Sequence, residues 1–493
     1  MPKKTKVKEN NKKITRLIVP AILIVSAITL IYSIIDLKVL PLKYLFPIIV
    51  LITVITLLMT LWLNKSKGKF SKVIGVLLSI AMIVSMTQIS KIGNLIDNAT
   101  GADSKLHTIN VIVMKDSKYE SMKDLKDSSA TFGANLESDS KNINNAIDQI
   151  KAKEKITVEA ESYDDYFDLI EDLYDGKIDV ILLNKAFVPI VSEFKKDFEE
   201  DTRVIGTYEY AEKIINEKGP VDVSKDTFSI YVSGIDTYGS ISSVSRSDVN
   251  MIVTVNPVTN QILLTSIPRD YHVRLNMNGK KDKLTHAGLF GVDESMRTLE
   301  DLLNGEVDGD ETIDIDYFLR VNFSSVTKIV DALGGVAVNS NFNFTAGGKQ
   351  FVKGPNKVNG QEALAFTRER YQLPNGDNDR VKNQQALITG VLNKIMSPAI
   401  ITNFNGFLSS IDGAFEFSMD DTNLNKLLKK QIDSMPSWEI IPIQLLGTGA
   451  RSTTTFAQPG RSTYVTEPNY ESVRKAAELI LKMENNEVIT PVN

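Results

Sequence analysis

The chain lacks cysteine altogether and contains only three histidines, His107, His272 and His286, in 493 residues. The absence of cysteine excludes disulfides, thiolate nucleophiles and cysteine-based zinc sites. With so few histidines, a histidine general base or a multi-histidine metal site is poorly supported as well. If the protein uses a metal ion, we therefore expect a hard cation held by oxygen ligands.

The charge of the chain is distributed unevenly along its length. Residues 1–72 contain 13 Lys or Arg and two acidic residues, a net charge of +11, so the other 421 residues carry −16 of the formal total of −5. A large acidic region does not favour nucleic-acid binding, because most of that affinity comes from neutralising phosphates. We therefore expect no nucleic-acid partner.

Long apolar runs occur in the first hundred residues. They cover about Ile14–Ile35, Leu40–Leu63 and Val73–Ile89, each close to the ~20 residues with which a helix crosses a bilayer. Lysines crowd the N-terminus and the loop between the second and third runs, which places both on the cytoplasmic side. The sequence thus predicts a cytoplasmic tail at 1–13, a three-helix membrane anchor at 14–92 and an extracellular remainder.

A polar linker at 97–104 leads into a first external unit, expected at 105–222. Its expected elements are strands at 107–115 and 178–183 and helices at 140–153 and 163–174. Alternating strands and helices predict a small α/β domain. Because no polar residues converge in it, an accessory role as a spacer or interaction domain is favoured over ligand binding.

A second α/β domain is expected at 226–440, with 441–493 as its C-terminal extension. Its expected elements are strands at 228–235, 249–255, 261–267 and 335–339 and helices at 293–303, 324–333 and 379–396. Helices interleaved with paired strands predict an α-β-α sandwich. In the extension, the stretch TGARSTTTF is interpreted as structural, the alternative being a loop near a cleft.

Polar side chains of this domain gather at the ends of the expected strands. Asp236 ends the first strand, and Arg246 and Asp248 are two residues apart, which places them on one face of an extended chain. Arg269 and Asp270 come directly after the strand at 261–267. Surface ion pairs would not require this phasing, so the pattern indicates a common site.

The segment AFTRERYQLPNGDNDRVKNQQ, residues 365–385, adds further cationic groups. Arg368 and Arg370 are interpreted as lying on one face of a strand, with Glu369 facing solvent. Arg380 and Gln384 are four apart and stack on one face of the helix expected to begin near 379. The intervening turn has no assigned role.

Clustered arginines and aspartates favour phosphate chemistry. Arginine forks match phosphate oxygens and stay charged, while neighbouring aspartates suit Mg²⁺ or Mn²⁺ that shares the phosphates. This set is equipped for phosphoryl transfer. No GxxxxGK[ST] motif is present in the sequence, so an ordinary P-loop kinase or NTPase is disfavoured.

These motifs together resemble the LytR-CpsA-Psr family over about residues 228–400. The resemblance rests on DTYGSISSVSRSDVNMIVTVNPVTNQILLTSIPRD, KLTHA, IDYFLRVNFSSVTKIVDALGGV, VNGQEALAFTRER and DNDRVKNQQALI, in the family's order and spacing. It implies a phosphotransferase on the outer face of a Gram-positive cell membrane. Such an enzyme moves wall teichoic acid or capsular polysaccharide from undecaprenyl pyrophosphate to peptidoglycan, and envelope-assembly proteins are possible partners of the accessory domain.

The resemblance also implies roles for individual residues. It assigns Asp236 and Asp248 to Mg²⁺ and gives Arg246, Arg269 and Asp270 catalytic roles. The residues implied in pyrophosphate binding are Arg246, Arg269, Lys283, Arg368, Arg370, Arg380 and Gln384, with Arg320 at a less distinctive position. The proton of the attacking sugar hydroxyl is accepted by Asp270 or Asp248, and the sequence does not choose between them.

Two points stay open at this stage. Apolar residues in LTHAGLFGV, MRTLEDLL and FSSVTKIVDALGG are suited to line a groove for a polyprenyl tail, but their helical spacing favours ordinary core packing. A protein that only binds or senses polyprenyl pyrophosphate, or a pyrophosphatase that hydrolyses it, would use the same arginines.

Overall fold

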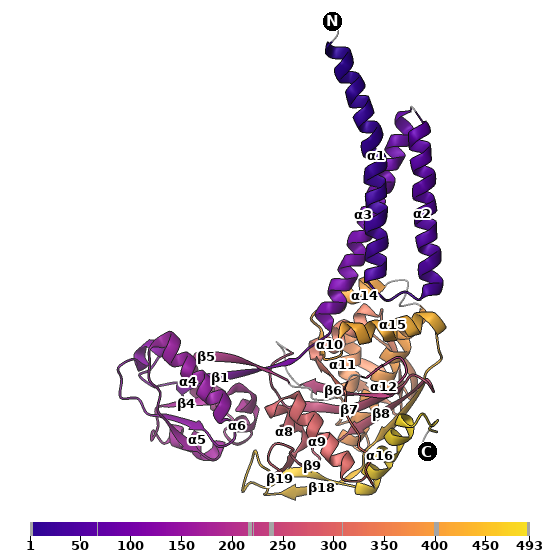
Figure 1. Ribbon diagram of the computed structural model, residues 1–493. Helices are drawn as coiled ribbons and strands as arrows, with labels where there is room; N and C mark the ends of the chain where they lie inside the picture. Colours follow the sequence, from indigo (N-terminus) through magenta and orange to yellow (C-terminus); the bar gives the residue numbers. More distant parts are fainter. Residues whose placement is uncertain are drawn as a thin grey trace.

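The computed structural model describes residues 3–66, 68–214, 219, 221–235, 241–307, 309–398 and 404–490. It has three parts: a stalk of long helices, a small α/β unit at one side and a larger α/β domain at the base of the stalk (Figure 1). Asp236, assigned to the metal from the sequence, lies outside the described residues.

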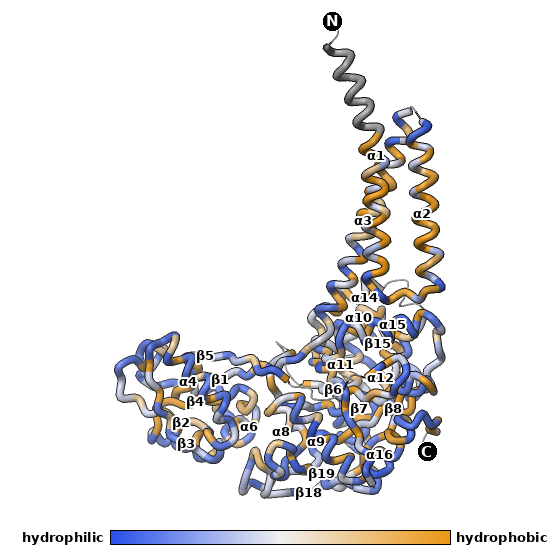
Figure 2. The backbone as a smooth tube through the Cα atoms, in the orientation of Figure 1, coloured by the Kyte–Doolittle hydropathy of each residue, from blue (hydrophilic) through white to orange (hydrophobic). Residues whose placement is uncertain are grey.

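The stalk confirms the three apolar helices. They are α1 (Lys3–Asp36), α2 (Leu42–Lys65) and α3 (Lys69–Ala99). In the described part of the chain, three stretches are long and apolar enough to cross a membrane, Leu17–Asp36, Leu42–Lys65 and Lys69–Ala99. Figure 2 shows the same hydrophobic colouring along most of the stalk, whereas both α/β units are mixed in colour.

The third helix extends further than the sequence predicted. Ile92, Leu95 and Ile96 pack into an apolar core of the larger domain together with the neighbouring α14 (Phe404–Ile411). The predicted linker at 97–104 is therefore wrong in its first half, because this tertiary packing keeps the chain helical as far as Ala99. The stalk is thus joined to the domain by a continuous helix.

The small unit is the expected accessory α/β domain. In its described residues a sheet of order β3-β2-β4-β1-β5 is flanked by helices. Its elements are β1 (Ser104–Met114), η1 (Met122–Leu125), β2 (Phe132–Asn135), α4 (Ser140–Glu154), β3 (Ala160–Tyr163), α5 (Tyr166–Tyr174), β4 (Val180–Asn184), η2 (Lys185–Phe187), α6 (Val188–Phe194), α7 (Phe198–Asp201) and β5 (Thr202–Lys213). β1 and β5 pair along their whole length as an antiparallel ribbon that connects the unit to the larger domain (Figure 1).

The larger domain is an α/β/α sandwich, as expected. Its central sheet has the order β16-β11-β6-β7-β8-β17 within the described residues. The strands are β6 (Phe228–Ile235), β7 (Ser247–Asn256), β8 (Gln261–Ile267), β11 (Tyr317–Asn322), β16 (Phe415–Phe417) and β17 (Glu439–Gln444). β7 runs antiparallel to both β6 and β8, whereas β11 is parallel to β6 and β17 is parallel to β8.

Helices cover both faces of this sheet because the strands alternate their side chains. Ile252 of β7 faces the core formed with α9 (Val292–Asn304) and α16 (Tyr470–Glu484). Its neighbours Met251 and Val253 face the opposite core, shared with α12 (Asp377–Ile395) and α15 (Asp421–Ser434). The remaining elements are β9 (His272–Arg274), β10 (Lys281–Lys283), α8 (Leu284–Ala287), η3 (Gly288–Phe290), α10 (Phe323–Ala332), β12 (Val336–Ser340), β13 (Phe344–Ala346), β14 (Lys349–Phe351), β15 (Gly354–Val358), α11 (Gly360–Arg368), β18 (Gly447–Ser452) and β19 (Thr463–Pro468).

The strand predicted around Arg368 is wrong, because the segment before it is helical. Asn359 caps α11 by accepting a hydrogen bond from the Glu362 amide (2.9 Å), and the Glu362 carboxylate accepts one from the Asn359 amide (2.9 Å). Ala363 and Phe366, three residues apart, are both buried. The alternation of Arg368 and Arg370 concealed this helical spacing.

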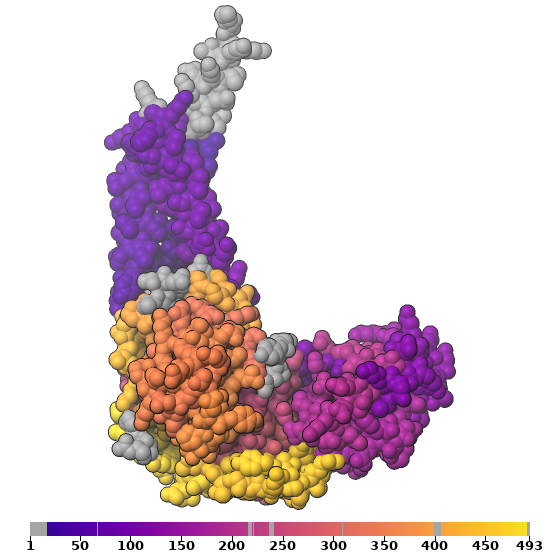
Figure 3. All heavy atoms as spheres, turned by 180° about the vertical axis from the view of Figure 1, so that it is seen from behind, coloured from indigo at the N-terminus to yellow at the C-terminus, as the bar shows by residue number. Residues whose placement is uncertain are grey.

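The C-terminal extension is part of the sandwich. The boundary drawn at 440/441 falls inside β17, and α16 supplies much of the core on one face of the sheet. In Figure 3 the C-terminal residues, in yellow, run along the base of the larger domain as far as the accessory unit. The loop 453–462, which contains the end of TGARSTTTF, therefore joins the two units.

The three segments considered for a lipid groove do not line one common space but are divided among different apolar cores. Leu284 and Leu299 belong to the core of α9 and α16, whereas Val330 and Leu333 of the α10 region pack with α11 and α14. These contacts are the ordinary core packing that the helical spacing favoured.

Candidate anion-binding site

Strand register brings the first acid and arginine together. Asn250 of β7 lies opposite Ile267 of β8, and continuing this antiparallel register by two residues places Asp248 opposite Arg269. Arg269 Nη1 donates to Asp248 Oδ1 over 2.8 Å. Two residues predicted for one site thus meet at one end of the sheet.

Asp270 and Lys283 continue the cluster. The Asp270 carboxylate lies 3.6 Å from Arg269 Nε and 3.6 Å from Lys283 Nζ, and both its side chain and that of Lys283 are largely buried. The chain after Lys283 is tied to the same edge, because the amide of Thr285 donates to the carbonyl of Arg269 over 2.8 Å. Lys283 is therefore held next to Asp270 by backbone contacts.

A buried acid–histidine pair supports Lys283. Asp282, fully buried, lies 2.7 Å from Nδ1 of His286 and accepts hydrogen bonds from the amides of Lys283 (2.8 Å) and Ala457 (2.9 Å). The sequence reasoning missed this pair. Asp282 and His286 are four residues apart in KDKLTHA, but Asp282 lies in β10 and His286 in α8, so no single local periodicity revealed the pair.

The first turn of α12 supplies Arg380 to the cluster. Arg380 Nη2 lies 2.7 Å from Oδ1 of Asp377, one turn earlier. Burial lowers the pKa of the Arg380 guanidinium, and the charges of Arg269 and Arg370 lower it further, against the opposing effect of Asp377 and Asp248. Burial also acts to lower the pKa of Arg269, but Asp248, Asp270 and Asp377 outweigh it and raise that pKa.

Two donors in this cluster make no hydrogen bond to any described residue, although one of them, Nε of Arg269, lies 3.6 Å from the Asp270 carboxylate. In the described part of the chain, Nε of Arg269 and Nε of Arg380 are both buried and have no hydrogen-bond partner. A buried donor without a partner costs about 1–3 kcal/mol, so such groups mark a ligand contact. The cluster is therefore suited to an anion that is placed between these two guanidinium groups.

Asp377 was also missed, because the turn that contains it had no assigned role. Its neighbour Asp379 is fully buried and fixes this turn: it accepts hydrogen bonds from the amide and side chain of Asn375 (2.9 and 3.0 Å) and from Lys382 (2.8 Å). Burial acts to raise the pKa of Asp379, but these contacts outweigh it and lower that pKa. Gly376, with φ of 53°, makes the entry into α12 possible.

The remaining residues of the segment 365–385 lie around this cluster. Arg370 is near enough for its charge to affect Arg380, and its Nη2 donates to the Tyr371 hydroxyl over 2.7 Å. Arg368 is exposed, with its guanidinium 4.2 Å from the ring centre of Phe323. Gln384 is half-buried on α12, one turn beyond Arg380.

Glu369 lies at the end of α11 and has a structural partner. Its carboxylate accepts a hydrogen bond from the amide of Gln372 over 2.9 Å. This contact closes the turn after α11. The prediction that Glu369 faces solvent rested on alternation along a strand. Alternation cannot reveal a partner such as the Gln372 amide.

Arg246 contacts the accessory unit. Its Nη1 lies 2.7 Å from Oε1 of Glu193, at the end of α6, and the other oxygen of Glu193 accepts from Gln458 over 2.8 Å. The backbone just before Arg246 is also bonded to the accessory ribbon, since the amide of Val244 donates to the carbonyl of Leu106 over 3.0 Å. The accessory unit thus holds the segment that carries Arg246.

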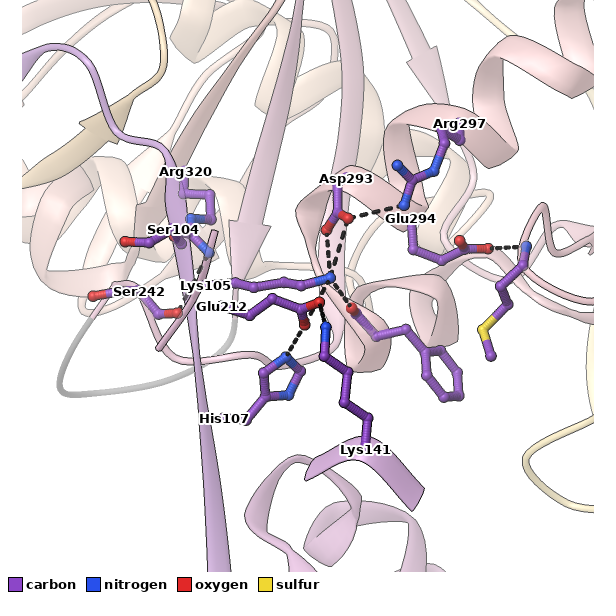
Figure 4. A network of polar contacts seen from close by, with 12 residues as sticks. Ser104, Lys105, His107, Lys141, Glu212, Ser242, Asp293, Glu294, Arg297 and Arg320 are labelled. Atoms are coloured by element: carbon purple, nitrogen blue, oxygen red, sulfur yellow. Dashed lines mark hydrogen bonds and ion pairs between the residues drawn. The ribbon is translucent and has the colours of Figure 1, made fainter. Parts of the chain in front are cut away.

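Arg320 belongs to a polar network at the base of the β1–β5 ribbon rather than to the anion cluster. It is 3% exposed, pairs with Glu416 and donates to the carbonyl of Ser104 over 2.8 Å. Beside it, Lys105 of β1 reaches the Asp293 carboxylate of α9 over 3.0 Å, as Figure 4 shows. These contacts fix the base of the β1–β5 ribbon on the larger domain.

The residues present are compatible with a divalent cation. Within the described residues no group of three or more His, Cys, Asp or Glu is arranged to hold a metal. Mg²⁺, however, needs only one or two carboxylates when substrate phosphates complete its shell. Asp248, which bonds Arg269 through Oδ1, is a fitting ligand of that kind through its other oxygen.

The fold and the cluster define a class: α/β/α proteins with apolar helices near the N-terminus that are long enough to span a membrane, and with a cationic cluster suited to an anion. The chain belongs to the LytR-CpsA-Psr family, whose model matches residues 192–475, more than half of its length. A model of a DNA polymerase processivity factor matches residues 65–183. That match stops inside β4 and leaves out β5, so it does not coincide with the accessory unit.

Curated relatives carry one common name, polyisoprenyl-teichoic acid–peptidoglycan teichoic acid transferase TagU. The protein of that name from Enterococcus faecalis is 33% identical over 248 residues, which cover 49% of this chain and 77% of the relative. One from Bacillus anthracis is 36% identical over 232 residues, 47% and 73% of the two chains.

Solved structures of similar proteins also match. The crystal structure of Bacillus subtilis TagU is 28% identical, with a TM-score of 0.40, and covers 54% of this chain and all of that one. TagT bound to LI-WTA is 24% identical, with a TM-score of 0.42, and covers 54% and 94%. TM-scores this low do not indicate a shared function.

Proposed function

We propose that this chain is a transferase that attaches an anionic glycopolymer of the teichoic acid type to peptidoglycan. The support from relatives is the activity in the name of the TagU proteins, which share about a third of the aligned residues with it. The observation in the chain that carries the proposal is the buried, neighbouring pair Arg269 and Arg380, whose Nε atoms make no hydrogen bond within the described residues. Two neighbouring guanidinium groups match the oxygens of a pyrophosphate.

The donor in this proposal is a polymer linked to a polyprenyl pyrophosphate in the outer leaflet. A sugar hydroxyl of peptidoglycan attacks the phosphorus next to the polymer and forms a new P–O bond. The phosphoanhydride bond breaks, and polyprenyl phosphate leaves with the bonding electrons. Arg269, Arg370 and Arg380 stabilise the charge that develops on the bridging and terminal oxygens.

Mg²⁺ is a further part of the proposal, with Asp248 and Asp236 as its ligands. When bound, it would neutralise charge on the pyrophosphate. If Asp248 serves the metal, Asp270 is the carboxylate that remains to accept the hydroxyl proton. Lys283, which shares Asp270 with Arg269, is placed to hold that carboxylate in position.

The extracellular location of the domain is inferred in this proposal from the lysines of the tail and of the loop between α2 and α3. A sensing protein would need a cytoplasmic output, and the expected tail at 1–13 and loop are short for one. A pyrophosphatase would need the same arginines, and differs only in using water as the nucleophile.

A transfer assay separates these functions. Purified chain in detergent is given a labelled lipid-linked teichoic acid and soluble peptidoglycan oligomers, and polymer-linked glycan and free polymer are measured. We expect the linked product with Mg²⁺ and none after EDTA treatment, with activity restored by adding Mg²⁺ back. Free polymer without linked product would establish a pyrophosphatase, and tight donor binding without either product would establish a binding protein.

A further inference from the structure

A cleft adjoins the anion cluster on the side of the accessory unit. It has a volume of about 620 Å³ and is lined from three parts of the chain: Lys283 of the larger domain, Glu193 and Phe194 of the accessory unit, and the C-terminal residues Gln458 and Arg461 to Tyr464. Lys283 also contacts Asp270, so this cleft and the anion cluster share a wall. A substrate bound at the cluster can therefore extend into the cleft.

The cleft is held in shape by contacts between the two units. The Glu193 carboxylate is occupied on both oxygens, by Arg246 and by Gln458. Phe187 of the accessory unit packs edge-on against Phe290 of the larger domain, with ring centres 5.6 Å apart. At the base of the ribbon, Lys105 bridges to Asp293 (Figure 4). The accessory unit is thus a fixed wall of the cleft.

Arg461 supplies an available cation in this cleft. Its guanidinium lies 3.8 Å from the ring centre of Phe167 and 4.8 Å from that of Phe194, so two aromatic faces fix its plane. Among the described residues no carboxylate forms an ion pair with it, and the residue is exposed. A guanidinium stacked in this way directs its N–H groups edge-on toward an anion.

The other lining groups suit a phosphorylated polyol. Ser462 and Tyr464 provide hydroxyls, and Tyr464 is 51% exposed, whereas the Thr463 hydroxyl already donates to Gln458 over 2.9 Å. Glu193 is paired with Arg246 and Lys283 with Asp270, so among the described lining residues Arg461 is the charge that stays free for a ligand. Hydroxyls, an exposed ring and such a cation match a chain in which sugar or polyol units alternate with phosphates.

The position of the cleft indicates which substrate it holds. β18 and β19 lie at the end of the larger domain away from the apolar helices, and the accessory unit projects from its side (Figures 1 and 3). A lipid tail at the cluster has to point toward the membrane, so the polymer that it carries leaves in the opposite direction. We propose that this cleft is a subsite for the first phosphate-bearing repeats of the donor polymer, with Arg461 as a specificity-determining residue, an inference that rests on the proposed function.

Binding of a soluble polymer tests the subsite directly. A labelled short poly(glycerol phosphate) oligomer is titrated at low salt onto the full chain in detergent, and fluorescence anisotropy is measured. We expect Arg461→Gln to weaken binding about tenfold, the loss of roughly one charge-assisted contact. Arg461→Lys, which keeps the charge without the planar fork, should be intermediate. Arg474→Gln removes an exposed arginine of α16, outside the cleft, and should bind like the wild type.

Several results would overturn the subsite. Unchanged binding in Arg461→Gln would remove its central residue, and an equal loss in Arg474→Gln would reduce the effect to non-specific charge. If Arg461→Gln instead lost binding to soluble peptidoglycan oligomers but kept the polymer, the cleft would hold the acceptor. If Arg461→Gln unfolds, Tyr464→Ala is used instead, because it removes only an exposed side chain. The subsite then stands only if Tyr464→Ala weakens binding of the same oligomer.

The same proteins separate this inference from the proposed function. The wild-type chain could transfer polymer from none of the lipid-linked donors and still bind the oligomer through Arg461. That result would reject the transferase and retain the subsite. Transfer by Arg461→Gln with an unchanged KM for a long anionic donor would reject the subsite and retain the transferase.

Discussion

At the scale of single residues, the site brings together positive charges that repel each other and that an anion would neutralise. Arg269 and Arg380 are close enough for their charges to oppose each other, and burial adds to the cost of both. Asp248 and Asp377 offset part of this repulsion. The unpartnered Nε atoms show where the balance is incomplete, and an incoming phosphate would complete it.

Replacing Arg380 by Ala should therefore affect transfer much more than folding. We expect a loss of about 10²–10³-fold in kcat, the usual effect of removing one donor that stabilises developing charge. Thermal unfolding should change little, because a repulsive, desolvated charge is removed together with its partial pairing to Asp377. Arg474→Ala serves as the matched control. An Arg380→Ala protein that transfers polymer at the wild-type rate would exclude the guanidinium from the mechanism.

At the scale of elements, the first turn of α12 places the arginine. Asp379, fully buried, ties the turn before the helix through Asn375 and is bonded to Lys382. A comparable acid on another helix is Asp420, which accepts from the Asn423 amide over 2.9 Å at the start of α15. Both acids secure the start of a helix, but of these two helices only α12 carries a predicted site residue.

This pair of acids gives a controlled test of positioning. Asp379→Ala and Asp420→Ala should each destabilise the protein by about 1–2 kcal/mol, as measured by denaturant unfolding. Only Asp379→Ala should also lower transfer by an order of magnitude or more, because Arg380 loses its fixed direction. Equal transfer by the two variants would mean that α12 is positioned by its apolar face alone.

The ribbon of β1 and β5 is a second element with a measurable property. His107 on β1 is almost fully buried beside Glu212, with Lys105, Lys141 and Asp293 also facing the network (Figure 4). Burial and the Lys105 charge lower the pKa of His107 to about 4, against the pull of Glu212. Its ordinary pKa is about 6.5, so between these two values the unfolded chain binds a proton that the folded one does not.

The stability of the ribbon should therefore fall as pH drops from about 6.5 to about 4. The loss has an upper bound of about 3.5 kcal/mol, from a shift of this size at about 1.4 kcal/mol per pKa unit. His107→Gln should remove that part of the pH dependence in thermal unfolding followed across this range. An identical pH profile in wild type and variant would show that His107 takes up its proton equally in the folded and unfolded states.

At the scale of the whole molecule, the apolar helices relate the site to a membrane. α1, α2 and α3 are apolar enough to span a bilayer, and α3 continues into the core of the larger domain. In the proposed arrangement this continuous helix places the domain close to the surface of the bilayer. A site so placed is suited to a substrate whose lipid stays in the membrane.

The absence of cysteine allows the sidedness to be measured without background. Single variants Ser66→Cys, in the loop before α3, and Thr448→Cys, on β18, are treated with a membrane-impermeant maleimide. In intact cells we expect labelling of Thr448→Cys alone, and of Ser66→Cys after lysis. The reverse pattern would place the larger domain in the cytoplasm and contradict the proposed function.

The sequence by itself determined the apolar helices, the α/β character of both units and three strands of the central sheet, β6, β7 and β8. These features come from local periodicity, such as the alternation in β7 that gives each face of the sheet its own core. It also selected Asp248, Arg269 and Asp270, because residues at the ends of adjacent strands meet at one edge of a sheet, whereas Lys283 was selected through the family resemblance.

Only the tertiary structure decided how the remaining residues are partnered. Arg246 contacts Glu193, 53 positions away, and Arg320 bonds to Ser104 at the base of the β1–β5 ribbon. The two units dock through such contacts, which no local spacing encodes. The helix before Arg368, the extension of α3 and the cleft beside Arg461 likewise depend on packing between distant segments. Periodicity specifies which face of an element is buried, whereas the neighbour on that face is set by the fold as a whole.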